Sequence, residues 1–322
     1  MQRLFATITL LALLLGEEIC AQTIKRESSI ALPPGMQVVL ASMASSGDRV
    51  AAVGGDGAVR VWKLPSGDLA KTLEMGQPAT AVQFSSDSRL IAIGDETGTV
   101  KVWDVSSWQV VLEFSAASDA WINALAISRD DGLLAVANDY DVQVWNLSTH
   151  QRVATVRAPF GHSFALSFSP DSRWLASADQ DAVVRLYDPH TGGLRSSVTD
   201  LLLESFSLDF SPDGKSLLVG GADRTISVID PVSGKIVGAL PKQSGLPKTL
   251  LVSTDGKQAA AIYPLPERFN HPSVVLLWDL GTQTVRARFE RPGVFVIGGA
   301  FTDDRFSLVG SSGGDLSIWS MK

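Results

Sequence analysis

The chain has 322 residues, of which 45% are hydrophobic and 19% are charged, so it is long enough to bury a sizeable core. Its 27 basic and 34 acidic residues give a formal net charge of −7. This charge disfavours nucleic acid and anionic membrane surfaces as partners.

The first predicted element is an N-terminal leader. An apolar run, LFATITLLALLLG, spans Leu4 to Gly16 after a single arginine, and Ala21 supplies a small residue before Gln22. This layout is typical of a secretory signal peptide, and the run is shorter than the roughly 20 apolar residues of a membrane span. We therefore expect a signal peptide at residues 1–21. The remaining residues 22–322 should form one exported domain, periplasmic or extracellular, without a membrane span.

Cys20 is the only cysteine of the chain. Its lipidation would anchor the protein to a membrane, but the lipoprotein pattern has a small residue where this chain has Ile19. We therefore expect no lipid anchor, with a membrane-anchored accessory subunit of an envelope complex as an alternative. Cleavage after Ala21 would leave a mature chain without cysteine, which excludes disulfides and cysteine-built zinc sites.

Seven similar segments follow the leader. Each contains a short apolar strand around one position, spaced by 41, 42, 42, 42, 49 and 41 residues, at Trp62, Trp103, Trp145, Tyr187, Ile229, Trp278 and Trp319. Upstream of each position lies a polar turn such as SSDSR, SPDSR or SPDGK, with apolar strands before and after it. Such turn chemistry between apolar strands is typical of β-hairpins. Each segment therefore predicts one small antiparallel sheet.

A fourth apolar strand follows 11 residues after each of the first six positions, centred on Leu73, Phe114, Val156, Val198, Leu240 and Phe289. Only three residues follow Trp319, so the seventh segment lacks this strand. Counting back by the same spacing from Trp62 indicates Ile30 or Leu32 as the missing counterpart. We expect the N-terminal residues to complete the last sheet, because an open seam would leave backbone groups unpaired.

The Ser-Pro-Asp-Gly turn, the Val-x-Val-Trp-Asp strand and the period resemble the WD-repeat (tryptophan–aspartate repeat) β-propeller family. The resemblance covers residues 24–322. It implies an all-β, seven-bladed β-propeller that is closed by an N-terminal strand completing the C-terminal blade. Because one fold hosts many functions, the resemblance does not identify an activity.

The family also has a buried network that runs from an Asp, six residues before the Trp, through a His and a Ser or Thr to the Trp. Matching aspartates occur at Asp56, Asp139, Asp181 and Asp223, and the other segments have Thr97, Pro272 and Gly313. A Gly-His pair occurs only at Gly161 and His162. We therefore expect apolar stacking to hold the sheets, small residues to allow close approach near the axis, and each Asp to cap its own turn.

Residue patterns for catalysis and metal binding are missing. The four histidines show no His-x-x-x-His spacing, no Gly-x-Ser-x-Gly elbow occurs, and no loop is densely acidic. We therefore expect no catalytic residues, no metal and no cofactor. The alternative is an exported propeller enzyme, lactonase- or glycosidase-like, that acts on a small molecule in the axial channel.

Two departures from the repeat indicate a binding surface. The extra residues of the sixth segment, within YPLPERFNHPS (263–273), join its second and third strands, which in the resembling family lie at the narrow face. Large side chains of other segments should lie near the same face. The full candidate surface comprises Trp121, Tyr140, Phe160, His162, Gln180, Arg224, Tyr263, Leu265, Arg268 and Phe269.

Two alternatives assign no binding role to this surface. The extra residues of the sixth segment could form a solvent-exposed loop without function, and Trp121 could pack between neighbouring sheets. We favour recognition, because Trp, Tyr and Arg dominate interface hot spots. The sequence thus predicts an exported, non-enzymatic and monomeric scaffold that binds a protein or peptide through the narrow face of a propeller.

Overall fold

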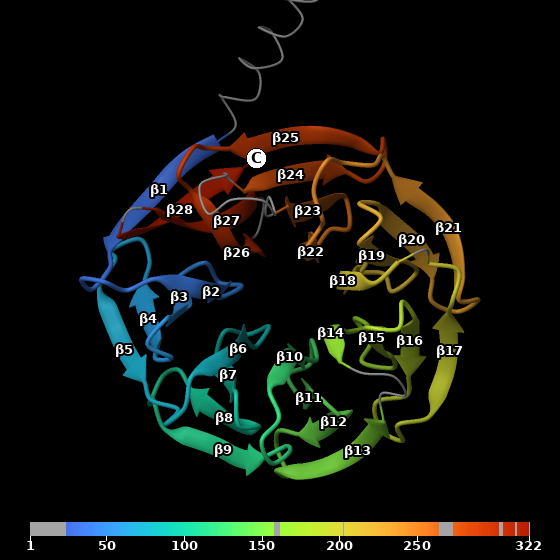
Figure 1. Ribbon diagram of the computed structural model, residues 1–322, viewed down its shortest axis with the longest axis horizontal. Helices are drawn as coiled ribbons and strands as arrows, with labels where there is room; N and C mark the ends of the chain where they lie inside the picture. The colour runs from blue at the N-terminus through green and yellow to red at the C-terminus, as the bar shows by residue number, and fades with distance from the viewer. Residues whose placement is uncertain are drawn as a thin grey trace, which may run out of the picture.

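A computed structural model describes residues 24–157, 162–201, 203–263, 273–302, 305–312 and 314–321. The predicted leader lies outside these residues and remains a prediction. The described residues form strands β1 to β28 in seven four-stranded sheets, without a helix, and the sheets surround a central axis as blades (Figure 1). This confirms the predicted all-β, seven-bladed β-propeller. No helix among the described residues has the length and apolar character needed to cross a membrane.

The first six blades each use four consecutive strands. Blades 1 and 2 contain β2 (Val38–Met43), β3 (Arg49–Gly54), β4 (Val59–Lys63), β5 (Leu69–Leu73), β6 (Ala79–Phe84), β7 (Leu90–Asp95), β8 (Thr99–Asp104) and β9 (Val110–Ser115). Blades 3 and 4 contain β10 (Ile122–Ile127), β11 (Leu133–Asn138), β12 (Asp141–Asn146), β13 (Gln151–Arg157), β14 (Ser163–Phe168), β15 (Leu175–Asp179), β16 (Val184–Tyr187) and β17 (Leu194–Val198).

Blades 5 and 6 contain β18 (Ser205–Phe210), β19 (Leu217–Gly221), β20 (Ile226–Asp230), β21 (Lys235–Leu240), β22 (Thr249–Val252), β23 (Gln258–Tyr263), β24 (Val274–Asp279) and β25 (Thr284–Glu290). Blade 7 combines β26 (Phe295–Thr302), β27 (Arg305–Ser312) and β28 (Asp315–Met321) with β1 (Ile24–Ala31). The first strand of each blade from β2 to β26 lies nearest the axis (Figure 1).

The ring closes as predicted, because β1 pairs antiparallel with β28. Ile30 lies opposite Leu316, three residues before Trp319, just as Leu73 lies opposite Val59, three residues before Trp62. Ile30 is therefore the counterpart of the other fourth-strand residues, and it is 3% exposed. N- and C-terminal residues thus share one sheet and one apolar core.

Neighbouring blades touch through apolar side chains and closely approaching backbones. The rings of Phe289 in blade 6 and Trp319 in blade 7 lie 5.4 Å apart. A Cβ atom on Gly94 of blade 2 would lie 2.4 Å from Ile122 of blade 3, so a larger residue there would force the blades apart. This position, at the end of a second strand, thus requires a glycine between two blades.

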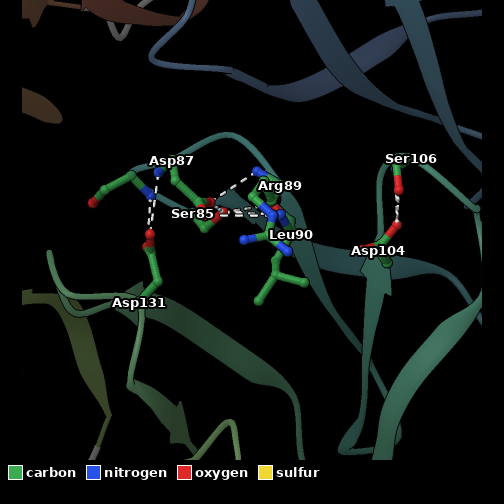
Figure 2. Close-up of polar contacts among 8 residues, drawn as sticks. Ser85, Asp87, Arg89, Leu90, Asp104, Ser106 and Asp131 are labelled. Atoms are coloured by element: carbon green, nitrogen blue, oxygen red, sulfur yellow. Dashed lines mark hydrogen bonds and ion pairs between the residues drawn. The ribbon is translucent and has the colours of Figure 1, made fainter.

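Polar turns connect the first and second strands of the blades. They lie on the face opposite the one that holds the loops before the first strands. In blade 2 the Ser85 hydroxyl donates to Asp87 Oδ1 (2.7 Å) and accepts the Leu90 N–H (2.9 Å), as Figure 2 shows. Asp131 of blade 3 accepts the N–H groups of Ser86 (2.9 Å) and Asp87 (3.2 Å). Burial raises the pKa of Asp131. These turns satisfy their own backbone groups and connect blade 2 to blade 3.

The turns between the third and fourth strands lie on the same face and contain a second set of polar side-chain hydrogen bonds. Asp104 accepts hydrogen bonds from the Ser106 hydroxyl (2.5 Å) and the Ser107 N–H (2.8 Å), the first of which is drawn in Figure 2. These bonds, led by that of Ser106, lower the pKa of Asp104 to about 2. The carboxylate is therefore committed to its own turn.

Blade 4 contains a polar core that the sequence interpretation missed. Arg185 donates to Asp179 Oδ2 (2.6 Å) and to both oxygens of Asp181 (2.9 and 2.6 Å), and Ser163 donates to Asp179 Oδ1 (2.6 Å). The side chains of Arg185 and Asp179 are 10% and 4% exposed. Blade 4 therefore adds a buried arginine–aspartate cluster to the expected apolar stacking, in which its residues take part through two apolar clusters.

Candidate functional site

The narrow face consists of the loops before the first strand of each blade and the turns between the second and third strands. A recurring backbone bond joins the two kinds of segment: the Gly55, Glu96 and Gln180 N–H groups donate to the Gln37, Pro78 and His162 carbonyls at 2.7, 3.1 and 2.9 Å. Each bond holds a loop against the turn of its own blade. Side chains of the loops and turns therefore lie at one end of the propeller.

Trp121 lies in the loop before β10, and 56% of its surface is exposed to solvent. The alternative interpretation, in which Trp121 packs between two sheets, is therefore wrong. Its backbone N–H donates to Asp139 Oδ2 (3.1 Å), while Asp139 Oδ1 accepts from Asn123 Nδ2 (3.0 Å) and lies 2.8 Å from His162 Nδ1. Asp139 thus ties the loop before β10 to the turn after β11 by hydrogen bonds and lies beside the loop before β14.

The prediction that each recurring Asp caps its own turn is confirmed for three residues and wrong for Asp139. Asp56, Asp181 and Asp223 accept the N–H of the residue two positions later, at 3.2, 3.2 and 3.1 Å. In blade 3 the buried Asn138 takes that role, since its Oδ1 accepts the Tyr140 (2.8 Å) and Asp141 (3.1 Å) N–H groups. Asp139 is thereby free to hold the Trp121 loop.

A groove of about 410 Å³ opens beside Trp121 and reaches across blades 1 to 3. Its lining includes Val39, which is 58% exposed, together with Pro78 and Ile122. Glu96 is the only charged residue among the described groove residues. Exposed apolar side chains beside a concave surface are typical of sites that bind another protein. We call this feature the Trp121 groove.

Other predicted surface residues differ in their exposure. Tyr140 is 63% exposed, and Gln180 and Arg224 are also exposed on the narrow face, each in the turn of a different blade. His162 is half-buried beside Asp139. Trp121, Asp139 and His162 therefore lie together, with Tyr140 next to Asp139 in sequence, whereas Gln180 and Arg224 belong to blades 4 and 5.

Tyr263 is a wrong prediction, because it is 2% exposed. It ends β23, pairs with Val274 of β24 and contributes to an apolar cluster between blades 5 and 6. Burial raises the pKa of Tyr263 to about 12. The sequence interpretation placed Tyr263 in the insertion, whereas the strand continues one residue further. Phe160, Leu265, Arg268 and Phe269 lie outside the described residues.

An axial pocket of about 320 Å³ lies among the inner strands of blades 3 to 6, and the sequence interpretation assigned no residue to it. Asp209 of β18 faces this pocket. Its Oδ1 accepts from Ser167 (3.2 Å) and the Phe210 N–H (3.0 Å), and its Oδ2 accepts from the Val252 N–H (2.8 Å). Burial raises the pKa of Asp209 to about 6. The sequence signal that could have identified Asp209 is the single acidic residue within the otherwise uncharged strand SFSLDF.

Asp209 gives the protein an expected pH dependence of stability. Because its pKa is higher in the folded state than in an unfolded chain, the folded state binds more protons between about pH 4 and pH 6. The contribution of Asp209 to the free energy of unfolding should therefore fall by about 1–2 kcal/mol as the pH rises through this range, whereas carboxylates with a lowered pKa, such as Asp181, act in the opposite direction. Urea unfolding at several pH values measures this. Asp209→Asn should remove this contribution, and an unchanged profile would contradict the assignment.

Four of the seven segments match the model of a known protein family. The family model "WD domain, G-beta repeat" matches residues 68–104, 108–146, 152–188 and 195–230. These ranges run from the fourth strand of one blade through the third strand of the next. This offset between sequence repeat and blade matches the way β1 completes blade 7.

Similar proteins come from several organisms. The WD repeat-containing protein SL1-17 of Schistosoma mansoni is 31% identical over 49% of this chain and 52% of its own length. Transcription factor unc-37 of Caenorhabditis elegans is 26% identical over 54% of this chain and 27% of its own length. The U3 small nucleolar RNA-associated protein 21 homolog of Schizosaccharomyces pombe is 28% identical over 44% and 16%. The chain thus spans about half or less of these relatives.

Proposed function

We propose that this chain, whose segments match the WD-repeat family model in four places, is an exported, non-enzymatic scaffold that binds a protein or peptide through its narrow face. The observation that carries this proposal is the exposed Trp121 beside an apolar groove. A large aromatic side chain on a fixed backbone loses little entropy on binding and supplies much contact area. The proposal that the protein is exported is supported by the signal-peptide-like sequence of residues 1–21.

Rigidity of the loop supports recognition further. The Trp121 N–H and the Asn123 amide both bond to Asp139, which also contacts His162. A preorganised loop needs less ordering when a partner binds. The named relatives include a transcription factor and a protein associated with a small nucleolar RNA, but alignments that cover only 27% and 16% of those two proteins support only the shared repeats.

The alternative, a lactonase- or glycosidase-like enzyme, would use the axial pocket. Glycosidases generally need two carboxyl groups flanking the scissile bond. Asp209 is the only carboxylate among the described residues of this pocket, and both of its oxygens already accept hydrogen bonds. A structural tie between blades 4, 5 and 6 accounts for Asp209 better than acid–base catalysis does.

Trp121→Ala should abolish most partner binding while leaving the fold unchanged. Removing a hot-spot Trp costs about 2 kcal/mol or more, a loss of affinity of about 30-fold or more. The tagged protein, introduced into its source cells, is recovered with its partners from the extracytoplasmic fraction after brief cross-linking. Comparison of bound proteins between wild type and variant measures the loss.

Val232→Ala is the matched control, since Val232 is 79% exposed in a turn of the opposite face. This variant should retain the same bound proteins as wild type. Identical bound proteins in all three samples would remove the Trp121 groove from consideration. Recovery of the protein itself only from the cytoplasm would contradict export.

A further inference from the structure

We propose that the axial pocket binds a small organic anion, whose carboxylate pairs with Arg129 and whose apolar body contacts Phe164 and Phe206. Arg129 lies in the turn after β10 and lines both axial cavities, of about 320 and 440 Å³. Phe164 and Phe206 belong to the inner strands of blades 4 and 5 and line the first of these cavities. This pocket is distinct from the Trp121 groove.

The first argument is that two cations beside the pocket have no carboxylate within ion-pair distance among the described residues, although Asp209 attracts Arg129 and Glu204 attracts Lys248. Within the described part of the chain, neither Arg129 nor Lys248 forms an ion pair, and Lys248 instead places its Nζ 3.0 Å from the centroid of the Phe206 ring. By contrast, Arg60 and Arg185 pair with aspartates of their own blades. Arg129 follows β10 and Lys248 precedes β22, so these two exposed cations lie at opposite ends of the inner strands. A cation at the mouth of a cavity that forms no ion pair is suited to bind an anion.

The second argument is the local charge balance. Arg129, Lys248 and Asp209 are the only charged residues among those described as lining the two cavities. The lining therefore carries a net positive charge inside a protein whose formal net charge is −7. Asp209 is hydrogen-bonded to Ser167 and to two backbone N–H groups and makes no hydrogen bond to Arg129. The Arg129 guanidinium thus keeps its donors for a ligand, which its planar fork can bind in a bidentate manner.

The third argument concerns the rest of the ligand. The rings of Phe164 and Phe206 lie 5.7 Å apart at a tilt of 54°, and both are half-buried in the pocket wall. Apolar walls with a few placed polar groups are typical of small-molecule sites, and 320 Å³ accommodates one small molecule. An aromatic or aliphatic carboxylate uses both the rings and the arginine, whereas an inorganic anion would leave the rings without contact.

The test is a ¹⁹F NMR titration of the protein with 3-(4-fluorophenyl)propanoate. Its neutral amide is the matched probe without charge. We expect saturable binding of the carboxylate and at least ten-fold weaker binding of the amide. Arg129→Gln should weaken carboxylate binding about ten-fold. Asp209→Asn should strengthen it several-fold, because it removes the only negative charge from the described pocket lining.

Arg89→Gln is the control variant, because Arg89 is 77% exposed in the opposite-face turn of blade 2. It should bind the carboxylate as wild type does, and so should Trp121→Ala, whose side chain lies in the separate groove. Circular dichroism confirms that each variant is folded. Equal binding of carboxylate and amide, unchanged binding by Arg129→Gln, or no saturable binding by the wild-type protein would each overturn the proposal. None of these results bears on the Trp121 groove.

Discussion

A chain that begins at Met36, and therefore lacks β1, is expected to lose most or all of its stability. This truncation removes the strand that pairs with β28 from Ile24 to Ala31 and uncovers the apolar cluster beneath Ile30 and Leu32. Burial of each such side chain contributes about 1.5–3 kcal/mol, before the lost strand pairing is counted. Whole domains are stable by only about 5–15 kcal/mol. Thermal and urea unfolding of the two chains measure the loss.

Point variants within β1 separate closure from truncation. Ile30→Ala should cost about 2–4 kcal/mol, because Ile30 is almost fully buried. Ala31→Ser on the same strand should change stability by less than about 0.5 kcal/mol, because Ala31 is exposed. An unchanged melting temperature for the chain that begins at Met36 would contradict closure through β1.

Asp179→Ala should cost about 3–5 kcal/mol of unfolding free energy, although Asp179 touches no ligand site. The variant removes one of the two carboxylate partners of the buried Arg185 and leaves the Ser163 hydroxyl without its acceptor. A buried guanidinium that has lost one of two carboxylates is far less stable than a fully paired one. Urea unfolding at neutral pH measures the cost.

Glu113→Ala is the matched surface variant, because Glu113 pairs with Lys101 at 3.4 Å but is 53% exposed. Solvent screening limits such a pair to about 0–1 kcal/mol. Similar losses for Asp179→Ala and Glu113→Ala would mean that the Arg185 cluster contributes no more than a surface pair. Blade 4 would then rely on apolar stacking like its neighbours.

Strand order and ring closure could be predicted because their signals are local and repeat. The turn of Ser85 to Leu90 satisfies its own backbone groups, so its residues indicate a hairpin without reference to the remaining fold. The spacing of seven such units also revealed that the last one lacked a strand. Ile30 could be identified because β1 obeys the same spacing as the other outer strands.

Residues of the candidate sites could be predicted only in part. Trp121 and Tyr140 were identified from residue type and position, but their exposure depends on which loops surround them. Tyr263 was assigned wrongly, because the end of β23 is set by its pairing with Val274 rather than by the following proline. The role of Asp139 was also missed, since its partners come from two other loops.

Local repetition thus specified the blade count, the strand order and the shared terminal sheet of this chain. The Asp139 contacts, the Arg185 cluster and the axial pocket join residues from segments that lie far apart in sequence, or line a space between several blades. Nothing in one repeat encodes which side chain of another blade will face it. Those features arise only when the blades are packed around a common axis, because burial, charge pairing and cavity shape are properties of the assembled ring.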